Sequence, residues 1–231
     1  MLDDADISDA ASAAARRSFS NMGQICIAVN RILVADKIHD SFVEALVAET
    51  RRIRLGHGVA PGVLYGPMLH EGARSRVERH VEDAVRRGGK LLVGGARPDG
   101  PGLDRGFFFE PTLIDEAPDE ALVMTEESYG PIAAIRRVRG DDDALAVANS
   151  LPFGLAAYVY SQDLERAWSF AERLETGAVG VNINDTTELQ APFGGWKLSG
   201  VGRELGPEGL MAYRETKHIK IRFRRNEGGH S

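Results

Sequence analysis

Residues 19–35 read FSNMGQICIAVNRILVA, in which a glycine-bearing loop is followed directly by a short apolar strand. The strand is predicted at residues 31–35, RILVA, because a short apolar run beside turn residues is typical of a buried strand. Residues 5–19 are rich in alanine and carry acidic side chains at their start, where the helix dipole favours them, so they predict a helix. The only cysteine, Cys26, therefore lies between a helix and a strand, at the mouth of the predicted sheet.

Strands and amphipathic helices alternate along most of the chain on either side of this loop. The further helices are predicted at residues 38–53, 70–87, 142–149 and 164–175. The further strands are predicted at residues 90–93, 112–114, 132–138, 156–160 and 178–181. This alternation predicts an α/β domain with a largely parallel sheet flanked by helices.

The last segment has a different pattern. Basic and apolar side chains alternate in residues 217–225, and this period of two predicts a strand. The strand would be an exposed edge, so an arm that pairs with another subunit of a homo-oligomer is the favoured interpretation. A basic nucleic-acid-binding tail is the alternative, but it would not need the apolar alternation. The prediction is one domain at residues 1–216 and an oligomerisation arm at residues 217–231.

Composition limits the classes of function. With 231 residues, 43% of them hydrophobic and 27% charged, one large domain with a sizeable core is expected. The net charge of -6 does not indicate nucleic acid, and the apolar runs are too short to span a membrane. The acidic start is the reverse of a signal peptide, so a cytoplasmic location is expected. A single cysteine, and six histidines without helical ligand spacing, predict no metal site.

Cys26 is the candidate for chemistry. A lone cysteine is more often a buried, inert thiol, but this one follows a glycine-bearing loop and precedes a strand. A thiolate there would need backbone N–H groups or a nearby positive charge to lower its pKa, and the sequence does not say which. Such a thiolate would attack a carbonyl carbon, and the backbone N–H beside it could hold the developing oxyanion.

Four blocks of sequence resemble the aldehyde dehydrogenase superfamily, in the order found in that family. The first is FSNMGQIC at residues 19–26, which is similar to the signature whose cysteine is the nucleophile, and LDDADISDA before it resembles the segment leading into that signature. The others are EESYGPI at 126–132, Asn149 with LPFGL at 151–155, and APFGGWKLSGVGRE at 191–204. Blocks spread over nearly the whole chain make the resemblance specific.

The resemblance implies roles for individual residues. Cys26 would form a thiohemiacetal with the aldehyde and, after hydride transfer, a thioester, while its backbone N–H supplies half of an oxyanion hole. Glu127 matches the glutamate that binds the nicotinamide ribose of NAD or NADP, and Tyr129 stands where the family usually has phenylalanine near the nicotinamide. Without the resemblance, Glu127 would be interpreted as a solvated surface carboxylate.

Three apolar residues would shape the substrate site. Phe193 matches the aromatic residue of the family's substrate tunnel, and Ile25 and Ile27 flank the nucleophile. Ordinary core packing is the alternative for all three. The glycines of GVGRELG at 200–206 resemble a dinucleotide fingerprint, but the third is one residue late and no apolar strand leads into them, so they predict turns.

The family's cofactor domain precedes the catalytic cysteine, and only 25 residues do so here. The glutamate that activates water for deacylation and the asparagine that completes the oxyanion hole would also lie upstream. The chain is therefore expected to be inactive as a dehydrogenase on its own. The alternatives are a CoA-acylating aldehyde dehydrogenase, residual esterase activity, and a non-catalytic association module. The polar loop at 184–190, NDTTELQ, weakly favours a functionalised aldehyde as substrate.

Overall fold

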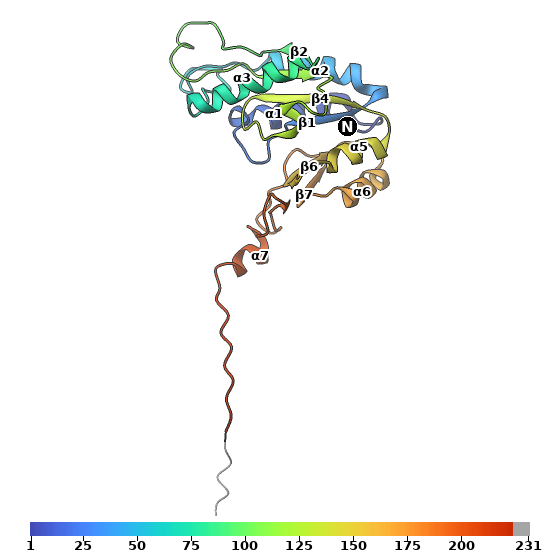
Figure 1. Cartoon of the computed structure of the whole chain (residues 1–231), viewed down its shortest axis with the longest axis vertical. Coiled ribbons are helices and arrows are strands. Elements are labelled where there is room, and N and C mark those ends of the chain that lie inside the picture. The colour runs from blue at the N-terminus through green and yellow to red at the C-terminus, as the bar shows by residue number, and fades with distance from the viewer. Residues whose placement is uncertain (224–231) are drawn as a thin grey trace, which may run out of the picture.

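The computed structural model describes residues 1–223 of the chain. Its centre is a four-stranded sheet in the order β1-β4-β3-β2 (Figure 1). The strands are β1 (Arg31–Ala35), β2 (Lys90–Val93), β3 (Thr112–Asp115) and β4 (Ile132–Val138). β1, β4 and β3 are parallel, as predicted, but β2 is antiparallel to β3, so the sheet is mixed. A parallel pair needs a crossover element between its strands, whereas β2 and β3 are joined by an irregular loop alone.

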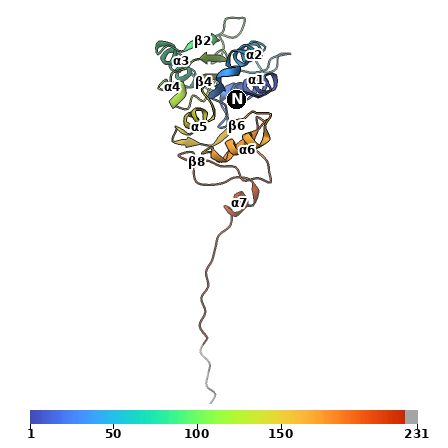
Figure 2. The same ribbon diagram turned by 90° about the vertical axis from the view of Figure 1, so that its right-hand side faces the viewer.

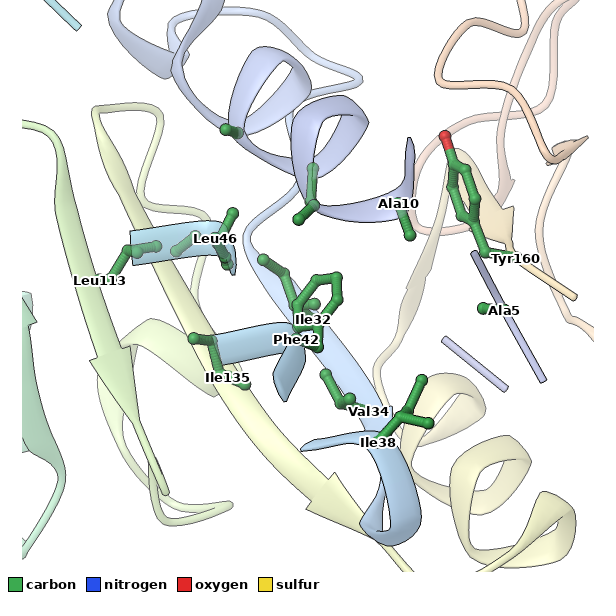
Figure 3. Close-up of a cluster of buried hydrophobic side chains, with 14 of the residues drawn as sticks. Ala5, Ala10, Ile32, Val34, Ile38, Phe42, Leu46, Leu113, Ile135 and Tyr160 are labelled. Carbon is green, nitrogen blue, oxygen red and sulfur yellow. The ribbon is translucent and has the colours of Figure 1, made fainter. Parts of the chain in front are cut away.

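Helices cover both faces of this sheet. α1 (Ile7–Phe19) and α2 (His39–Arg51) pack together on one face, and α3 (Glu71–Arg86) packs on the other. The buried residues of β4 alternate between the two cores: Ala133 and Ile135 face α1 and α2, while Ile132 and Ala134 face α3. Figure 3 shows the first of these cores. The sheet is therefore buried on both sides, which fixes the strand that follows Cys26.

The helix boundaries follow from capping side chains. Asp6 accepts a hydrogen bond from the Asp9 backbone N–H at 3.0 Å, so α1 begins two residues later than predicted. The ring of His70 caps α3 by accepting from the Ala73 N–H at 3.1 Å. Gly88, with φ +106°, ends the same helix where a left-handed residue is needed. These local signals are visible in the sequence, which explains the close agreement.

A smaller unit lies beside the main sheet (Figure 2). The parallel strands β6 (Ala156–Val159) and β7 (Ala178–Val181) pack with two helices around a third buried cluster. These helices are α5 (Asp141–Asn149) and α6 (Leu164–Arg173). Four further short elements were not predicted: α4 (Leu122–Thr125), β5 (Phe153–Gly154), β8 (Trp196–Lys197) and α7 (Gly206–Met211). Two to six residues are too few to show a hydrophobic period.

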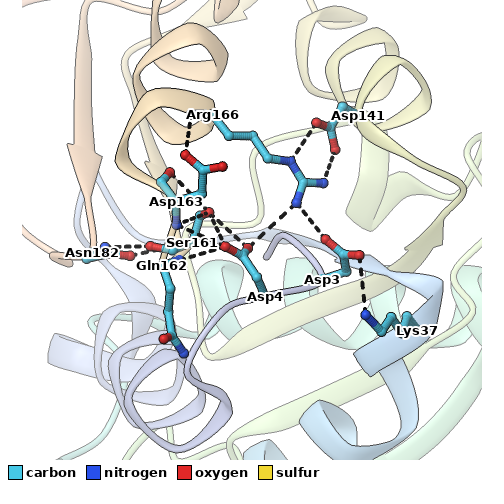
Figure 4. Close-up of polar contacts among 9 residues, drawn as sticks. All are labelled: Asp3, Asp4, Lys37, Asp141, Ser161, Gln162, Asp163, Arg166 and Asn182. Atoms are coloured by element: carbon cyan, nitrogen blue, oxygen red, sulfur yellow. Dashed lines mark hydrogen bonds and ion pairs between the residues drawn. The ribbon is translucent and has the colours of Figure 1, made fainter.

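Polar contacts join the chain start to this smaller unit (Figure 4). The Asp4 carboxylate accepts from the Ser161 hydroxyl at 2.8 Å and from the backbone N–H groups of Gln162 and Asp163, both at 2.9 Å. Arg166 binds both carboxylate oxygens of Asp141 and pairs with Asp3 at 2.6 Å. Residues 2–10 (LDDADISDA) therefore connect the start of α1 to the smaller unit.

Residues 214–223, beyond α7, run away from the protein as an extended, exposed segment (Figure 1). Residues 217–223 form no strand within the single chain, and Arg224 and Arg225 of the predicted strand lie outside the described residues. The pairing of this arm with another subunit stays a prediction. Within residues 1–223, none of the helices combines the length and apolar character that crossing a membrane requires.

Candidate active site around Cys26

The loop that carries Cys26 has an unusual backbone. Asn21, Met22 and Gly23 all have left-handed φ values, of +51°, +57° and +67°. Such a conformation costs about 1–2 kcal/mol for a residue with a side chain, so surrounding contacts must hold it. Met22 is buried against the core beside α3, and the Gln24 side chain accepts from the Leu69 N–H at 2.9 Å. The loop is therefore anchored on the α3 side of the sheet.

Cys26 sits on an exposed turn after this anchor. The Ala28 N–H donates to the Ile25 carbonyl at 3.0 Å, which makes Cys26 the second residue of a β-turn. Its side chain is exposed, whereas Ile27 is buried and Ile25 is half-buried. The backbone N–H groups of Cys26 and Ile27 donate to no acceptor among residues 1–223. The thiol is accessible, and free N–H groups lie beside it.

At Gly23, the loop of residues 19–26 that carries Cys26 (the cysteine loop) contacts the loop of residues 126–131 that carries Glu127 and Tyr129 (the predicted cofactor loop). A Cβ atom built on Gly23 would lie 2.1 Å from the carbonyl oxygen of Gly130, so the two backbones are in direct contact. Gly130 belongs to the EESYGPI block, and Gly23 belongs to the FSNMGQIC block. Two blocks about 100 residues apart thus meet at a place where only glycine fits.

A cleft of about 550 Å³ collects most of the predicted site residues. Cys26, Ile25, Ile27, Glu127 and Tyr129 all line it. Phe193, the predicted tunnel residue, is not among the lining residues. It is half-buried, and its backbone pairs with Glu204 in an isolated bridge. The structure therefore brings the nucleophile and cofactor candidates together in one cleft, and the tunnel role of Phe193 stays a prediction.

His80 holds the loop that carries Glu127 and Tyr129. This loop follows α4, and Tyr129 has a left-handed φ of +46°. The fully buried Ser128 hydroxyl lies 2.9 Å from Nδ1 of His80, on α3. Nε2 of His80 lies 3.7 Å from the Glu126 carboxylate. Sequence reasoning missed His80, although its place between Val77 and Val81 on the apolar face of α3 was a signal.

Burial lowers the pKa of His80, and Glu126 opposes this effect only in part. Because the folded pKa lies below the unfolded value of about 6.5, the fold favours the neutral imidazole. The free energy of unfolding is therefore expected to fall as the pH drops below about 6.5, and the substitution His80→Gln should remove that part of the pH dependence. Urea titrations from pH 7 to pH 5 measure the difference between the two proteins.

The exposed His218 provides the control, because His218→Gln should leave the pH dependence of stability unchanged. A difference between wild type and His80→Gln that stays constant from pH 7 to pH 5 would contradict the assignment.

Two more side chains from distant segments shape the wall beside Cys26. The Tyr158 hydroxyl, from β6, donates to the Ile27 carbonyl at 3.2 Å and so holds the cysteine turn. Burial raises the pKa of Tyr158, so its hydroxyl is neutral at pH 7. Arg17, from the last turn of α1, donates to the Asn184 carbonyl and pairs with Asp185. These contacts connect the predicted polar loop to α1.

The remaining two family blocks meet at the end of α5. Arg31 donates to the carbonyls of Val147 and Ala148 at 3.0 and 3.1 Å. Lys197 donates to the carbonyls of Asn149 and Leu151 at 2.8 and 3.0 Å. Two cations at a helix C-terminus satisfy its free carbonyls and its dipole. Of these residues, Arg31, Ala148, Asn149 and Leu151 line the cleft.

One cluster has the composition of a metal site. His39, Asp115 and Glu116 offer ligand atoms within 4.8 Å of one another. The two ring nitrogens of His39 lie 3.0 Å from Asp40 and from Asp115, and Arg137 pairs with Glu116 at 3.2 Å. These contacts already satisfy the buried groups, so we interpret the cluster as a tie between α2 and the end of β3.

Comparison with known proteins decides the family. The sequence profile of the aldehyde dehydrogenase family matches residues 1–219. The chain belongs to this family. It is 39% identical to the glutarate-semialdehyde dehydrogenase of Pseudomonas putida, over 96% of this chain and 45% of that protein. It is 42% identical to the 3-sulfolactaldehyde dehydrogenase of Pseudomonas putida, over 95% of this chain and 44% of that protein.

A solved structure gives the same result. Betaine aldehyde dehydrogenase from Staphylococcus aureus, in complex with NAD+, superposes with a TM-score of 0.90 at 38% identity, over 94% of this chain and 43% of that one. The α/β architecture is thus that of an aldehyde dehydrogenase. The chain spans less than half the length of the relatives it matches.

Proposed function

We propose that this chain is the cysteine-bearing catalytic part of an NAD(P)-dependent aldehyde dehydrogenase. It would oxidise an aldehyde to a carboxylate through a thiohemiacetal and a thioester at Cys26. One observation carries the proposal: Cys26 lies on an exposed turn and lines the same cleft as Glu127 and Tyr129.

The cysteine turn is suited to acyl chemistry. As a thiolate, Cys26 would form a bond to the carbonyl carbon of the aldehyde, and the carbonyl oxygen would become an oxyanion. The free N–H groups of Cys26 and Ile27 are available to donate to that oxygen. Tyr158 would keep them in place, because it holds the Ile27 carbonyl on the other side of the turn.

Glu127 and Tyr129 fit the nicotinamide end of the cofactor. Both are exposed in the cleft, where a carboxylate can accept from ribose hydroxyls and an aromatic ring can pack against a flat base. When bound, NAD or NADP supplies the hydride acceptor. We propose that the rest of the nucleotide site, and the base that activates water, come from the part of the enzyme that corresponds to the unmatched portion of its relatives.

Alkylation of Cys26 tests the nucleophile. Iodoacetamide at pH 7 should label it faster than it labels N-acetylcysteine, and mass spectrometry reads one product because the chain has one cysteine. Cys26→Ser is the control and should remain unlabelled. A rate no faster than that of the free thiol contradicts the nucleophile assignment.

The arm favours a second role in assembly. Ile219, Ile221 and Phe223 are exposed on residues 217–223, in the alternation of a strand without a partner. We propose that the unit at residues 1–216 performs the chemistry and that residues 217–231 pair with another subunit in the cytoplasm. Sedimentation should show a homo-oligomer, and a clean monomer would contradict the arm's role. An oligomer whose Cys26 is unreactive would indicate an association module instead.

A further inference from the structure

Arg17 lies between the helix that leads to Cys26 and the polar loop at 184–190. Its side chain is only 13% exposed and lines the cleft together with Cys26. Its neighbour Arg16 is exposed and does not line the cleft. Of this adjacent pair of arginines, therefore, only one is directed toward the candidate active site.

The contacts of Arg17 leave part of its guanidinium available. Nε donates to the Asn184 carbonyl, and Nη2 pairs with the Asp185 carboxylate at 3.2 Å. Within residues 1–223, Nη1 makes no hydrogen bond. Asp185 in turn accepts from the Thr187 N–H and hydroxyl, and these bonds lower its pKa and keep it ionised. The pair is fixed in place while one amino group of the arginine remains free.

The two charges of this pair are screened unequally. Asp185 is 51% exposed, so water screens its negative charge strongly, whereas Arg17 is largely buried in the cleft wall. A charge in a partly desolvated wall acts on a ligand more strongly than one in water. The cleft beside Arg17 is therefore expected to have a positive potential.

The other charged side chains that line the cleft have partners of their own or a different assigned role. Arg31 donates to the carbonyls at the end of α5, and Glu175 pairs with Lys197 at 2.5 Å. Glu126 and Glu127 belong to the loop that contacts Gly23 through Gly130, which we assign to the cofactor. Arg17 is thus the cation available to the distal end of a substrate.

We propose that Arg17 is a specificity-determining residue and that the aldehyde bound at Cys26 carries an anionic group, a carboxylate or a sulfonate, at its far end. The inference rests on the proposed function, because it takes Cys26 as the nucleophile. Family membership leaves the charge open, since the relatives are named for anionic aldehydes and for cationic betaine aldehyde alike. Arg17 would favour the anionic aldehyde, because its positive charge attracts the anion and its free N–H groups can donate to it.

Charged thiol reagents measure this selectivity without a cofactor. Cys26 is treated with 2-sulfonatoethyl methanethiosulfonate and with its trimethylammonium counterpart, and each rate is divided by that of N-acetylcysteine. The ratio of the anionic to the cationic reagent should exceed one in wild type. Arg17→Gln should lower it about tenfold, the change expected when one unit charge is removed from the wall of a partly solvated cleft.

Three further variants make the result specific. Arg16→Gln, which removes the adjacent exposed charge, should leave the ratio nearly unchanged. Arg17→Lys should keep most of the ratio, and Asp185→Asn should raise it by a smaller factor than Arg17→Gln lowers it, because water screens the Asp185 charge. Circular dichroism establishes which variants fold, and if Arg17→Gln does not, the rise in Asp185→Asn decides the question. If Cys26 reacts but the ratio is the same in all variants, the role of Arg17 is overturned and the proposed function stands. If Cys26 reacts with neither reagent, the proposed function itself is overturned.

Discussion

Gly23→Ala is expected to abolish the fast alkylation of Cys26 and to lower the free energy of unfolding by about 2–4 kcal/mol. The added methyl group would lie 2.1 Å from the Gly130 oxygen and 2.6 Å from its carbonyl carbon. Both are backbone atoms, so no side-chain rotation relieves the overlap. In addition, alanine would have to adopt a φ of +67°. The cysteine loop and the cofactor loop should therefore separate.

Chemical denaturation and the rate of iodoacetamide labelling measure the two effects. Gly88→Ala is the matched control, since Gly88 also has a positive φ, of +106°, but a Cβ there meets nothing within 4 Å. In Gly88→Ala, the free energy of unfolding should fall by only about 1 kcal/mol, the cost of the backbone conformation, and the rate of Cys26 labelling should not change. If Gly23→Ala behaved like Gly88→Ala, the contact between the two loops would have no role in the site.

Much of the fold was predictable because its signals are local. The strands at 31–35, 90–93, 132–138 and 178–181 have the bounds that their apolar runs predict. The antiparallel direction of β2 was not predictable in this way, because strand direction depends on the connection and on the partner. Elements as short as α4 and β5 derive their stability from tertiary contacts, which periodicity does not report.

The candidate site, like the fold, was predictable where its signals are local and not where it depends on tertiary contacts. The exposure of Cys26 on a turn agrees with its position between a glycine-bearing loop and a strand. Its partners Arg17 and Tyr158, and the pair of His80 with Ser128, come from segments far apart in sequence, and only the fold brings them together. The tunnel role that the motif implies for Phe193 stays a prediction, since Phe193 does not line this cleft.

Asp83→Ala is expected to lower the free energy of unfolding by about 2–4 kcal/mol. The buried carboxylate accepts from the Leu122 N–H, the first of α4, at 2.9 Å. It also accepts from Arg87 at 2.9 Å and from Arg86 at 2.6 Å. Removing it would leave an N–H without a partner at the start of the helix that leads into Glu127.

The hydrogen bond from Leu122, together with the hydrogen bonds from Arg87 and Arg86 and the charge of Arg87, outweighs the effect of burial and lowers the pKa of Asp83 in the folded protein. An unfolded aspartate titrates near 3.9, so this stabilisation is fully present above that pH and is lost as the pH falls toward the lower folded pKa. Asp83→Asn keeps an oxygen acceptor for Leu122 but has no charge. It should cost less than Asp83→Ala and should reduce the loss of stability between pH 5 and pH 3.

Urea titrations across that range measure both variants. Asp142→Asn is the control, because Asp142 pairs with Arg173 at 2.9 Å but is 91% exposed, and an exposed pair contributes little. Hydrogen exchange should also become faster in residues 122–129 of Asp83→Ala, since α4 would lose its cap next to the cofactor loop. Equal stability of Asp83→Ala and wild type at pH 7 would show that α4 is held by its apolar contacts alone, and Val123 and Met124 would then position Glu127 through the core.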